Sequence, residues 1–239
     1  MASTTAPAKR GTQVRDTTVF LKIVMATTGI VFIGYVLLHM YGNLKIFGGQ
    51  EAFDTYAHHL RTFGEPMLPY GGLLWIVRIV LIAAIIGHVI SAFKLWSRAS
   101  GARSQRYAVK KAVAASISSR TMRWGGVALL VFVIWHLIHF TVTKPAINAD
   151  FSARAIQESP YTMVVASFQL WWMVLIYVLA LVALGLHLAH GVFSAQQTLG
   201  WTQSVGAYRR AQLIAYALAA VIVVGFALPP LAILFGFVG

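Results

Sequence analysis

The sequence predicts an all-α membrane protein with five transmembrane helices. Its 239 residues are 59% apolar and only 10% charged, whereas a soluble domain is about 45–50% apolar. A helix needs about 20 mostly apolar residues to cross the hydrocarbon core of a bilayer, and five segments of this chain are long enough. These observations exclude a soluble globular core. They predict a single membrane domain over residues 23–239, preceded by a basic tail over residues 1–22.

The five predicted spans are separated by polar connections that are too short to form a soluble domain. In chain order the spans cover residues 23–44, 67–93, 124–143, 163–193 and 211–228. Pro229 and Pro230 follow the fifth span, and we expect them to end or kink its helix because proline lacks a backbone N–H donor. The tail before the first span lacks the apolar core of a signal peptide and is expected to be retained.

Basic residues are divided unevenly between the two sides of the predicted bundle. Fourteen Lys and Arg lie in the tail and in the second and fourth connections, against four in the first and third connections. An excess of Lys and Arg marks the cytoplasmic side of a membrane protein. The N-terminus is therefore expected in the cytoplasm and the C-terminus outside. This distribution favours a membrane-orientation signal over a nucleic-acid-binding surface.

Each of the first four spans contains one histidine: His39, His88, His136 and His187. An ionisable side chain in hydrocarbon is costly and is by default functional, although a single histidine can simply form a hydrogen bond to a neighbouring helix. With a rise of 1.5 Å per residue, His39 and His136 fall near the outer ends of their spans. His88 and His187 fall near the inner ends, so the pattern predicts two histidine pairs at two depths.

The histidine spacing also repeats along the chain. His39 precedes His88 by 49 residues and His136 precedes His187 by 51, as if one helical hairpin were used twice. A glycine, Gly29 or Gly126, stands ten residues before the histidine in both outward-running spans. Ten residues is close to three helical turns, so we expect each glycine to leave room for a flat ring.

Two facing imidazoles in a dry four-helix bundle suit the axial positions of haem iron. The chain has no cysteine, which excludes iron–sulfur clusters and covalently attached c-type haem. Zinc or copper would need three or four converging ligands, which becomes possible only if His139 and His190 join their neighbours. We expect these two residues nearer the membrane interfaces, so haem is preferred and a metal site stays as an alternative.

At this point the sequence resembles a known family: the single-chain, five-helix dihaem cytochrome b anchors of succinate:quinone oxidoreductases and quinol:fumarate reductases. The likeness extends over most of the chain. It is carried by TTGIVFIGYVLLHMYGN, GHVISAFKLW, RWGGVALLVFVIWHLIHF and LGLHLAHGVFSAQQTLGW in the first four spans. Each string is weakly specific, but their order and histidine placement together are specific.

The resemblance implies two haem b groups in the bundle of the first four helices. His39 and His136 would ligate the outer haem, and His88 and His187 the inner one. A flavoprotein subunit and an iron–sulfur subunit would dock on the cytoplasmic face, and the chain would pass electrons to a membrane quinone, either menaquinone or ubiquinone. Succinate chemistry would take place in the partner subunits, and this chain would lie in the cytoplasmic membrane.

Further polar residues are candidates for supporting roles. Arg78 is the only Lys or Arg well inside a span and is expected near the outer haem, where a propionate could neutralise it. The alternative is an arginine that extends to the outer interface. His58, His59 and Glu65 in the first connection are candidate quinone-site residues. They could equally be ordinary solvated residues, with the quinone on the inner side against a partner subunit.

Two other functions stay open at the level of sequence. The chain could be a stand-alone dihaem cytochrome without cytoplasmic subunits. It could also be a transporter that uses its histidines as a relay, although it lacks the broken helices in matched halves that many transporters have.

Overall fold

The computed structural model describes residues 17–101 and 117–239, with side chains omitted for residues 117–120. This part of the chain is helical and contains no strand. Five of its helices are long and apolar enough to cross a membrane. They are carried by α1 (Thr18–Leu44), α3 (Gly72–Gly101), α4 (Ile117–Leu137), α7 (Trp171–Thr198) and α8 (Val205–Leu234).

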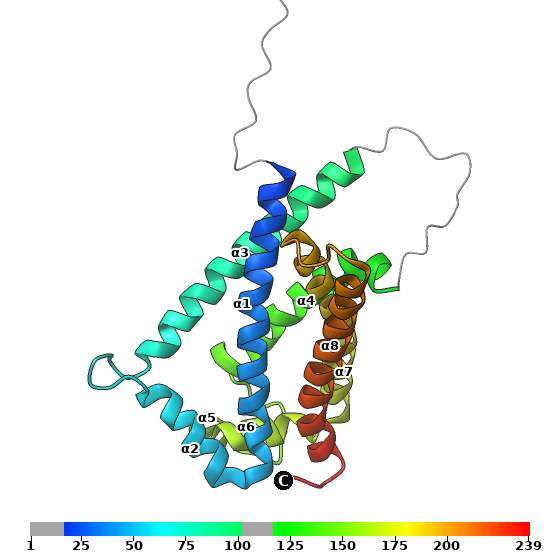
Figure 1. The fold of residues 1–239 in the computed structure, drawn as a ribbon. Helices are drawn as coiled ribbons and strands as arrows, with labels where there is room; N and C mark the ends of the chain where they lie inside the picture. Colours follow the sequence, from blue (N-terminus) through cyan, green and yellow to red (C-terminus); the bar gives the residue numbers. More distant parts are fainter. Residues whose placement is uncertain (1–16, 102–116) are drawn as a thin grey trace, which may run out of the picture.

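The long helices alternate in direction, so their connections divide between two ends of the bundle (Figure 1). The start of α1, the end of α3 and the α7–α8 connection lie at one end, which we call the basic end. The end of α1, the start of α3 and the C-terminus lie at the other, which we call the opposite end. This arrangement confirms the five-helix fold and the pairing of connections predicted from the sequence.

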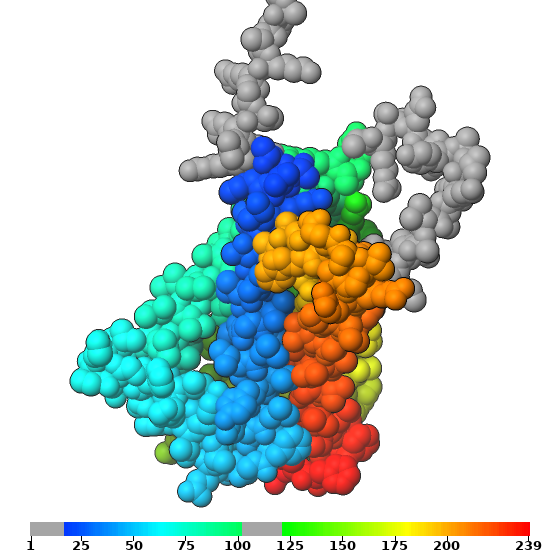
Figure 2. All heavy atoms as spheres, viewed as in Figure 1, coloured from blue at the N-terminus to red at the C-terminus, as the bar shows by residue number. Residues whose placement is uncertain are grey.

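The first connection contains more regular structure than its polar composition predicts. A 3₁₀ turn, η2 (Lys45–Gly48), leads into a surface helix, α2 (Gly49–Thr62). Gly49 joins them with a φ of 81°, a conformation that a residue without a Cβ adopts without strain. The segment from α2 to α3 projects from the side of the molecule (Figure 2).

The predicted fourth span is divided into two helices. A short helix, α6 (Pro160–Phe168), stops before the 28-residue α7 begins at Trp171. One continuous helix from 160 to 198 would be about 58 Å long, far more than the roughly 30 Å hydrocarbon core requires. The prediction that Met163 begins this span was therefore wrong: α7 crosses alone, and α6 packs across the opposite end of the bundle (Figure 1).

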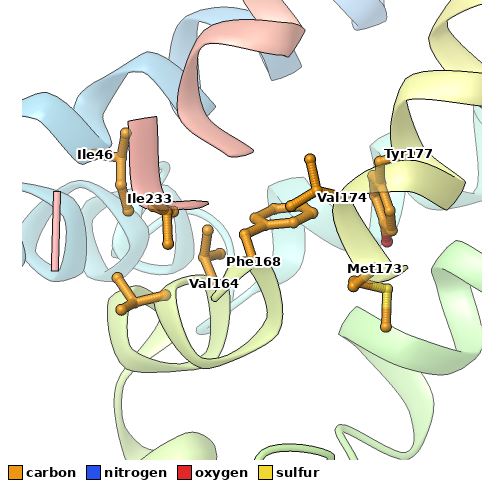
Figure 3. Close-up of a cluster of buried hydrophobic side chains, with 8 residues drawn as sticks. Ile46, Val164, Phe168, Met173, Val174, Tyr177 and Ile233 are labelled. Atoms are coloured by element: carbon orange, nitrogen blue, oxygen red, sulfur yellow. The ribbon is translucent and has the colours of Figure 1, made fainter. Parts of the chain in front are cut away.

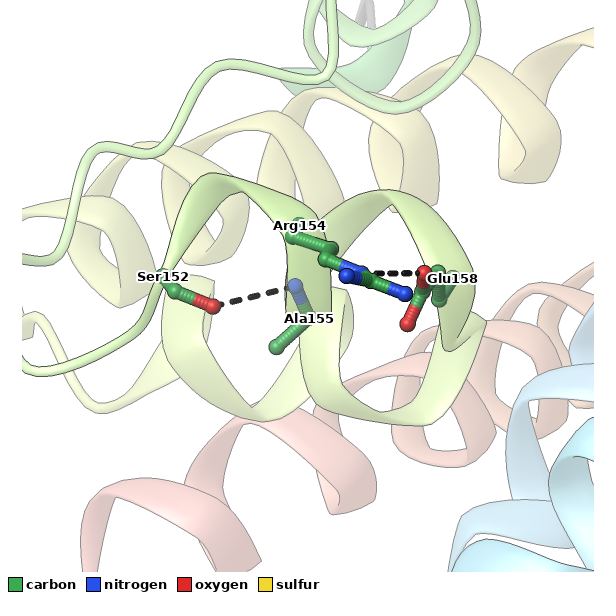
Figure 4. Close-up of polar contacts among 4 residues, drawn as sticks. All are labelled: Ser152, Arg154, Ala155 and Glu158. Carbon is green, nitrogen blue, oxygen red and sulfur yellow. Dashed lines mark hydrogen bonds and ion pairs between the residues drawn. The ribbon is translucent and has the colours of Figure 1, made fainter.

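The outer connection before α6 holds one more short helix, α5 (Ala153–Glu158). The Ser152 side chain accepts a hydrogen bond from the Ala155 N–H, and Arg154 pairs with Glu158 at 2.7 Å (Figure 4). Both partners of that pair are exposed. Asp54 of α2 ties this region to the bundle by accepting hydrogen bonds from the Ser159 hydroxyl and the Tyr161 N–H.

The proline pair does not end the fifth helix, which was one of the two expected outcomes. Pro229 and Pro230 are buried inside α8, which continues to Leu234. Transmembrane helices tolerate proline where neighbouring groups satisfy the backbone. Close packing of α8 also depends on small residues, because Gly225 allows the Met40 side chain of α1 to approach its backbone and Gly185 of α7 does the same for Val223.

Two clusters of buried side chains hold the bundle together. The first joins η2, α6, α7 and the end of α8 around Phe168, Met173 and Tyr177 (Figure 3). The second lies between α7 and α8 around Leu188 and Ile222. By contrast, α3 packs along α1, where a Cβ at Gly87 would lie 3.6 Å from Val24, and it tilts away from the other helices toward the opposite end (Figure 1).

Candidate functional site

The histidines predicted as an outer pair lie close together. His39 is near the end of α1 and His136 is near the end of α4, with ring centroids 5.9 Å apart and ring planes at 79°. The ring of Tyr35 stacks on His39 at 5.5 Å, and Phe226 of α8 contacts it at 5.6 Å. The chain therefore brings together two imidazoles from different helices inside an aromatic surrounding.

The predicted inner pair also lies close together. His88 of α3 and His187 of α7 have ring centroids 6.2 Å apart and ring planes at 52°. Phe32 of α1 contacts the His88 ring edge-to-face at 5.8 Å. The pairing by depth inferred from the spacing is thus present in the geometry of both levels.

Both centroid separations fit a metal ion bound between two imidazoles. A metal–imidazole bond is about 2 Å long, so two imidazoles that approach this closely from different helices could both reach one metal ion. No group of three or more His, Cys, Asp or Glu in the described residues is placed to hold a metal ion.

The inner pair has open space beside it. A cavity of about 350 Å³ between α4 and α7 is lined by residues that include Trp124, Leu179 and His187. The Nδ1 atom of His187 is buried without a hydrogen-bond partner in the described part of the chain. An unsatisfied buried nitrogen beside a cavity is expected where a ligand is to be bound.

Gly29 and Gly126 were predicted to make room beside His39 and His136, the outer pair. Both glycines lie instead at the level of the inner pair. A Cβ added at Gly126 would lie 3.6 Å from Cε1 of His187, so this glycine borders the inner pair although it shares α4 with His136. A Cβ at Gly29 would meet nothing within 4 Å. Its neighbour Thr28 contacts His88, which also places that turn of α1 at the inner level.

Hydroxyl groups contact one histidine of each pair, and sequence reasoning missed them. The Thr28 Oγ1 lies 2.9 Å from Nδ1 of His88. The Tyr177 hydroxyl lies 3.2 Å from Nδ1 of His136 and 3.4 Å from Nδ1 of His139. A signal existed, because hydroxyl side chains inside transmembrane helices generally find partners on neighbouring helices.

His139 is buried at the end of the bundle. It is 1% exposed and lies in a π-helical turn, η3 (Ile138–Val142), that follows α4. Its second ring nitrogen is 3.2 Å from the Ser167 hydroxyl of α6. Helix α6 folds across this end of the bundle and covers the histidine, and the position of His139 near a membrane interface stays a prediction. His190, by comparison, is half-buried.

Arg78 lies on α3 with its guanidinium 4.9 Å from the Trp75 ring centroid. It is also close enough to Tyr35, which stacks on His39, to interact with it electrostatically. The Arg78 side chain is exposed. Its neighbour Tyr35 places it at the level of the outer pair, and it has no carboxylate partner in the described residues.

The candidate quinone residues do not join the histidine pairs. His58 and His59 are exposed on α2, where they contact the rings of Tyr70 and Phe63, and Glu65 is exposed in the following turn. None of their hydrogen bonds or ring contacts in the described structure includes His39 or His136.

Several basic residues lie at the basic end of the bundle. Arg98 donates a hydrogen bond to the Thr18 hydroxyl at 3.4 Å, and the Arg123 guanidinium lies 5.5 Å from the Trp96 ring centroid. Eight other residues of the predicted basic side lie outside the described side chains: Lys9, Arg10, Arg15, Arg103, Arg106, Lys110, Lys111 and Arg120.

Fold and site together define a five-helix integral membrane protein with two intramembrane histidine pairs at two depths. A sequence model of the succinate dehydrogenase/fumarate reductase transmembrane subunit family matches residues 96–226, more than half of the chain. The chain belongs to this family and is the membrane anchor subunit of such a complex. Searches of curated proteins and of solved structures found no match.

Proposed function

We propose that this subunit carries electrons between a cytoplasmic iron–sulfur subunit and a membrane quinone through two b-type haems. The observation that carries the proposal is the pair of imidazole pairs, with ring centroids 5.9 Å and 6.2 Å apart, from four different helices. A bound haem would supply a reversible one-electron centre at each level, with a potential set by its ligands and surroundings.

The side chains of this protein have distinct tasks in that scheme. His39 and His136 hold the outer haem, and His88 and His187 hold the inner one. Gly126 keeps the space beside His187 free of a side chain. Apolar residues of the spans exclude water, which keeps both sites dry and strengthens the electrostatic influence of nearby charges.

The orientation follows from the basic residues. Fourteen Lys and Arg lie on the side of the tail and of the second and fourth connections, and the positive-inside bias assigns that side to the cytoplasm. The flavoprotein and iron–sulfur subunits then dock on this basic end, next to the inner histidine pair. Arg78 then lies near the outer haem, where a propionate is its counter-charge.

The quinone is assigned to the opposite end, where the first connection supplies groups that can exchange protons with water. His58, His59 and Glu65 are exposed there, and quinone reduction requires groups that supply protons. The chain contributes no Asp or Glu inside a predicted span, so these protons are taken up at the surface and not through a carboxylate path across the bilayer.

The test is a dithionite-reduced minus oxidised absorption spectrum of the complex purified in mild detergent, together with its haem, flavin and acid-labile sulfide content. We expect b-type bands and about two haems per copy of this chain. His136→Ala should remove about one haem of the two while the chain still inserts in the membrane. A wild-type complex without haem bands, or a His136→Ala variant that keeps both haems, would contradict the proposal.

A further inference from the structure

We propose that two hydrogen-bond chains, each ending on a backbone carbonyl, fix the ring tautomer of His88 and His136. In each ring the proton is held on Nδ1 and the lone pair is directed from Nε2. This inference rests on the proposed function, because it concerns how the protein prepares one ligand for each haem.

The inner chain has two hydrogen bonds. The Thr28 hydroxyl lies 2.7 Å from the carbonyl oxygen of Val24, one turn earlier in α1. A carbonyl only accepts and a hydroxyl has a single proton, so Thr28 donates its proton to Val24. Toward Nδ1 of His88, at 2.9 Å, the same oxygen can only accept. Nδ1 therefore carries the proton, and the lone pair of the neutral ring is on Nε2.

The outer chain is longer and its direction is set from the far end. The Ser167 hydroxyl donates to the Met163 carbonyl at 2.7 Å, so it accepts from Nε2 of His139 at 3.2 Å. The neutral His139 ring then has its lone pair on Nδ1, which accepts the Tyr177 hydroxyl proton at 3.4 Å. The Tyr177 oxygen in turn accepts from Nδ1 of His136 at 3.2 Å.

Both hydrogen-bond chains place the ring proton on Nδ1, although they are built from different residues. One uses a threonine on α1, and the other uses groups from α7, η3 and α6. The partner of His88 differs, because Nδ1 of His187 is buried without a hydrogen-bond partner among the described residues. The inner level thus combines one histidine that is fixed before the haem binds with one whose Nδ1 is not held by a hydrogen bond.

A hydrogen bond from Nδ1 makes the imidazole a stronger electron donor, as outer-shell partners of metal-bound histidine do. Stronger donation favours ferric over ferrous iron and lowers the midpoint potential. Removing the acceptor should therefore raise the potential of the haem at that level. Outer-shell substitutions typically change metal affinity by 10-fold or more, and a tenfold change in the ferric-to-ferrous preference corresponds to about 59 mV for one electron.

The experiment is a potentiometric titration of the haem absorbance in the purified complex. Thr28→Val keeps the size and shape of the side chain but removes the hydroxyl, and Thr28→Ser keeps the hydroxyl and removes the methyl group. We expect Thr28→Val to raise one of the two haem transitions by about 59 mV, a tenfold change, and Thr28→Ser to restore the wild-type value. Tyr177→Phe should raise the other transition by a similar amount, and Ser167→Ala should shift it in the same direction by less.

The outcomes separate this inference from the proposed function. A wild-type complex without haem contradicts the proposed function. A wild-type complex with two haems, whose transitions are unchanged in both Thr28→Val and Tyr177→Phe, overturns only the hydrogen-bond chains. If Thr28→Val loses a haem, Thr28→Ser decides: retention of that haem supports the role of the hydroxyl, and its loss contradicts it.

Discussion

The two histidine pairs lie in different surroundings although they share the same spacing. The outer pair is enclosed by aromatic rings, with Tyr35 stacked on His39 and Tyr177 bonded to His136. The inner pair lies beside Gly126 and a cavity of about 350 Å³. The outer pair is therefore surrounded by packed aromatic side chains, whereas the inner pair has a cavity beside it that a ligand could fill.

This contrast follows from the elements that meet at each level. Helix α6 and the π-helical turn η3 fold over the outer pair and bury His139 against Ser167. Among the described residues no helix covers the inner pair in a comparable way, and α3 packs along α1 without close packing against α4. We infer that a change in side-chain volume at the inner level mainly alters the haem content. The same change at the outer level mainly alters the stability of the fold.

The largest expected effect comes from filling the inner space. Gly126→Leu places a large side chain where a Cβ already lies 3.6 Å from His187, so the inner haem should be lost and the haem content should fall from about two to about one per chain. Haem is measured as its pyridine complex against protein concentration. Gly34→Leu is the matched control, because a Cβ there meets nothing within 4 Å. A Gly126→Leu variant that keeps two haems would contradict the claim that the inner haem depends on this space.

A smaller effect is expected from a cavity in the outer packing. Met173 is 0% exposed in the first cluster (Figure 3), and Met173→Ala should lower the free energy of unfolding by about 2–5 kcal/mol through lost contacts and the cavity left behind. The expected readout is a lower midpoint of thermal unfolding in detergent, with loss of the outer haem first. Ile222→Ala, which removes an equally buried side chain between α7 and α8, should lower the midpoint without this preference for the outer haem. An identical order of haem loss in both variants would contradict the assignment of Met173 to the outer level.

The smallest effect is electrostatic. Arg78→Gln removes a positive charge from the outer level, which should disfavour the more negative reduced state of that haem. Arg78 lies near the outer end of α3, where its side chain can extend to the interface and be partly screened, so we expect about a threefold change in the reduction equilibrium, equivalent to roughly 30 mV downward. Arg98→Gln at the basic end is the control. A shift in the inner transition after Arg78→Gln, with the outer one unchanged, would reverse the assignment of this arginine.

The sequence was sufficient to predict the five spans because the hydropathy of a bilayer-crossing helix is a local property. It was also sufficient to pair His39 with His136 and His88 with His187, since the rise per residue of a helix converts sequence position into depth. It failed at the break before Trp171. The hydropathy of residues 163–193 is continuous, and only the folding of α6 across the bundle distinguishes a buried surface helix from a membrane span.

Which hydroxyl contacts which ring nitrogen could not be predicted from the sequence. Thr28 and His88 are 60 residues apart, and His136 and Tyr177 are 41 apart. Nothing local distinguishes these hydroxyls from others in the spans. In the same way, the ten-residue spacing associated Gly126 with His136 on its own helix, but the imidazole beside Gly126 belongs to His187 on another helix.

The amino-acid sequence by itself determined how many helices cross the membrane, how they alternate and at what depth each histidine lies, because these properties depend on hydrophobicity and on the geometry of a single helix. Only the tertiary structure decided which hydroxyl meets which imidazole, which level is closed by packing and where open space is left. Those features arise from contacts between segments distant in the chain, and the rotation and tilt of packed helices set such contacts.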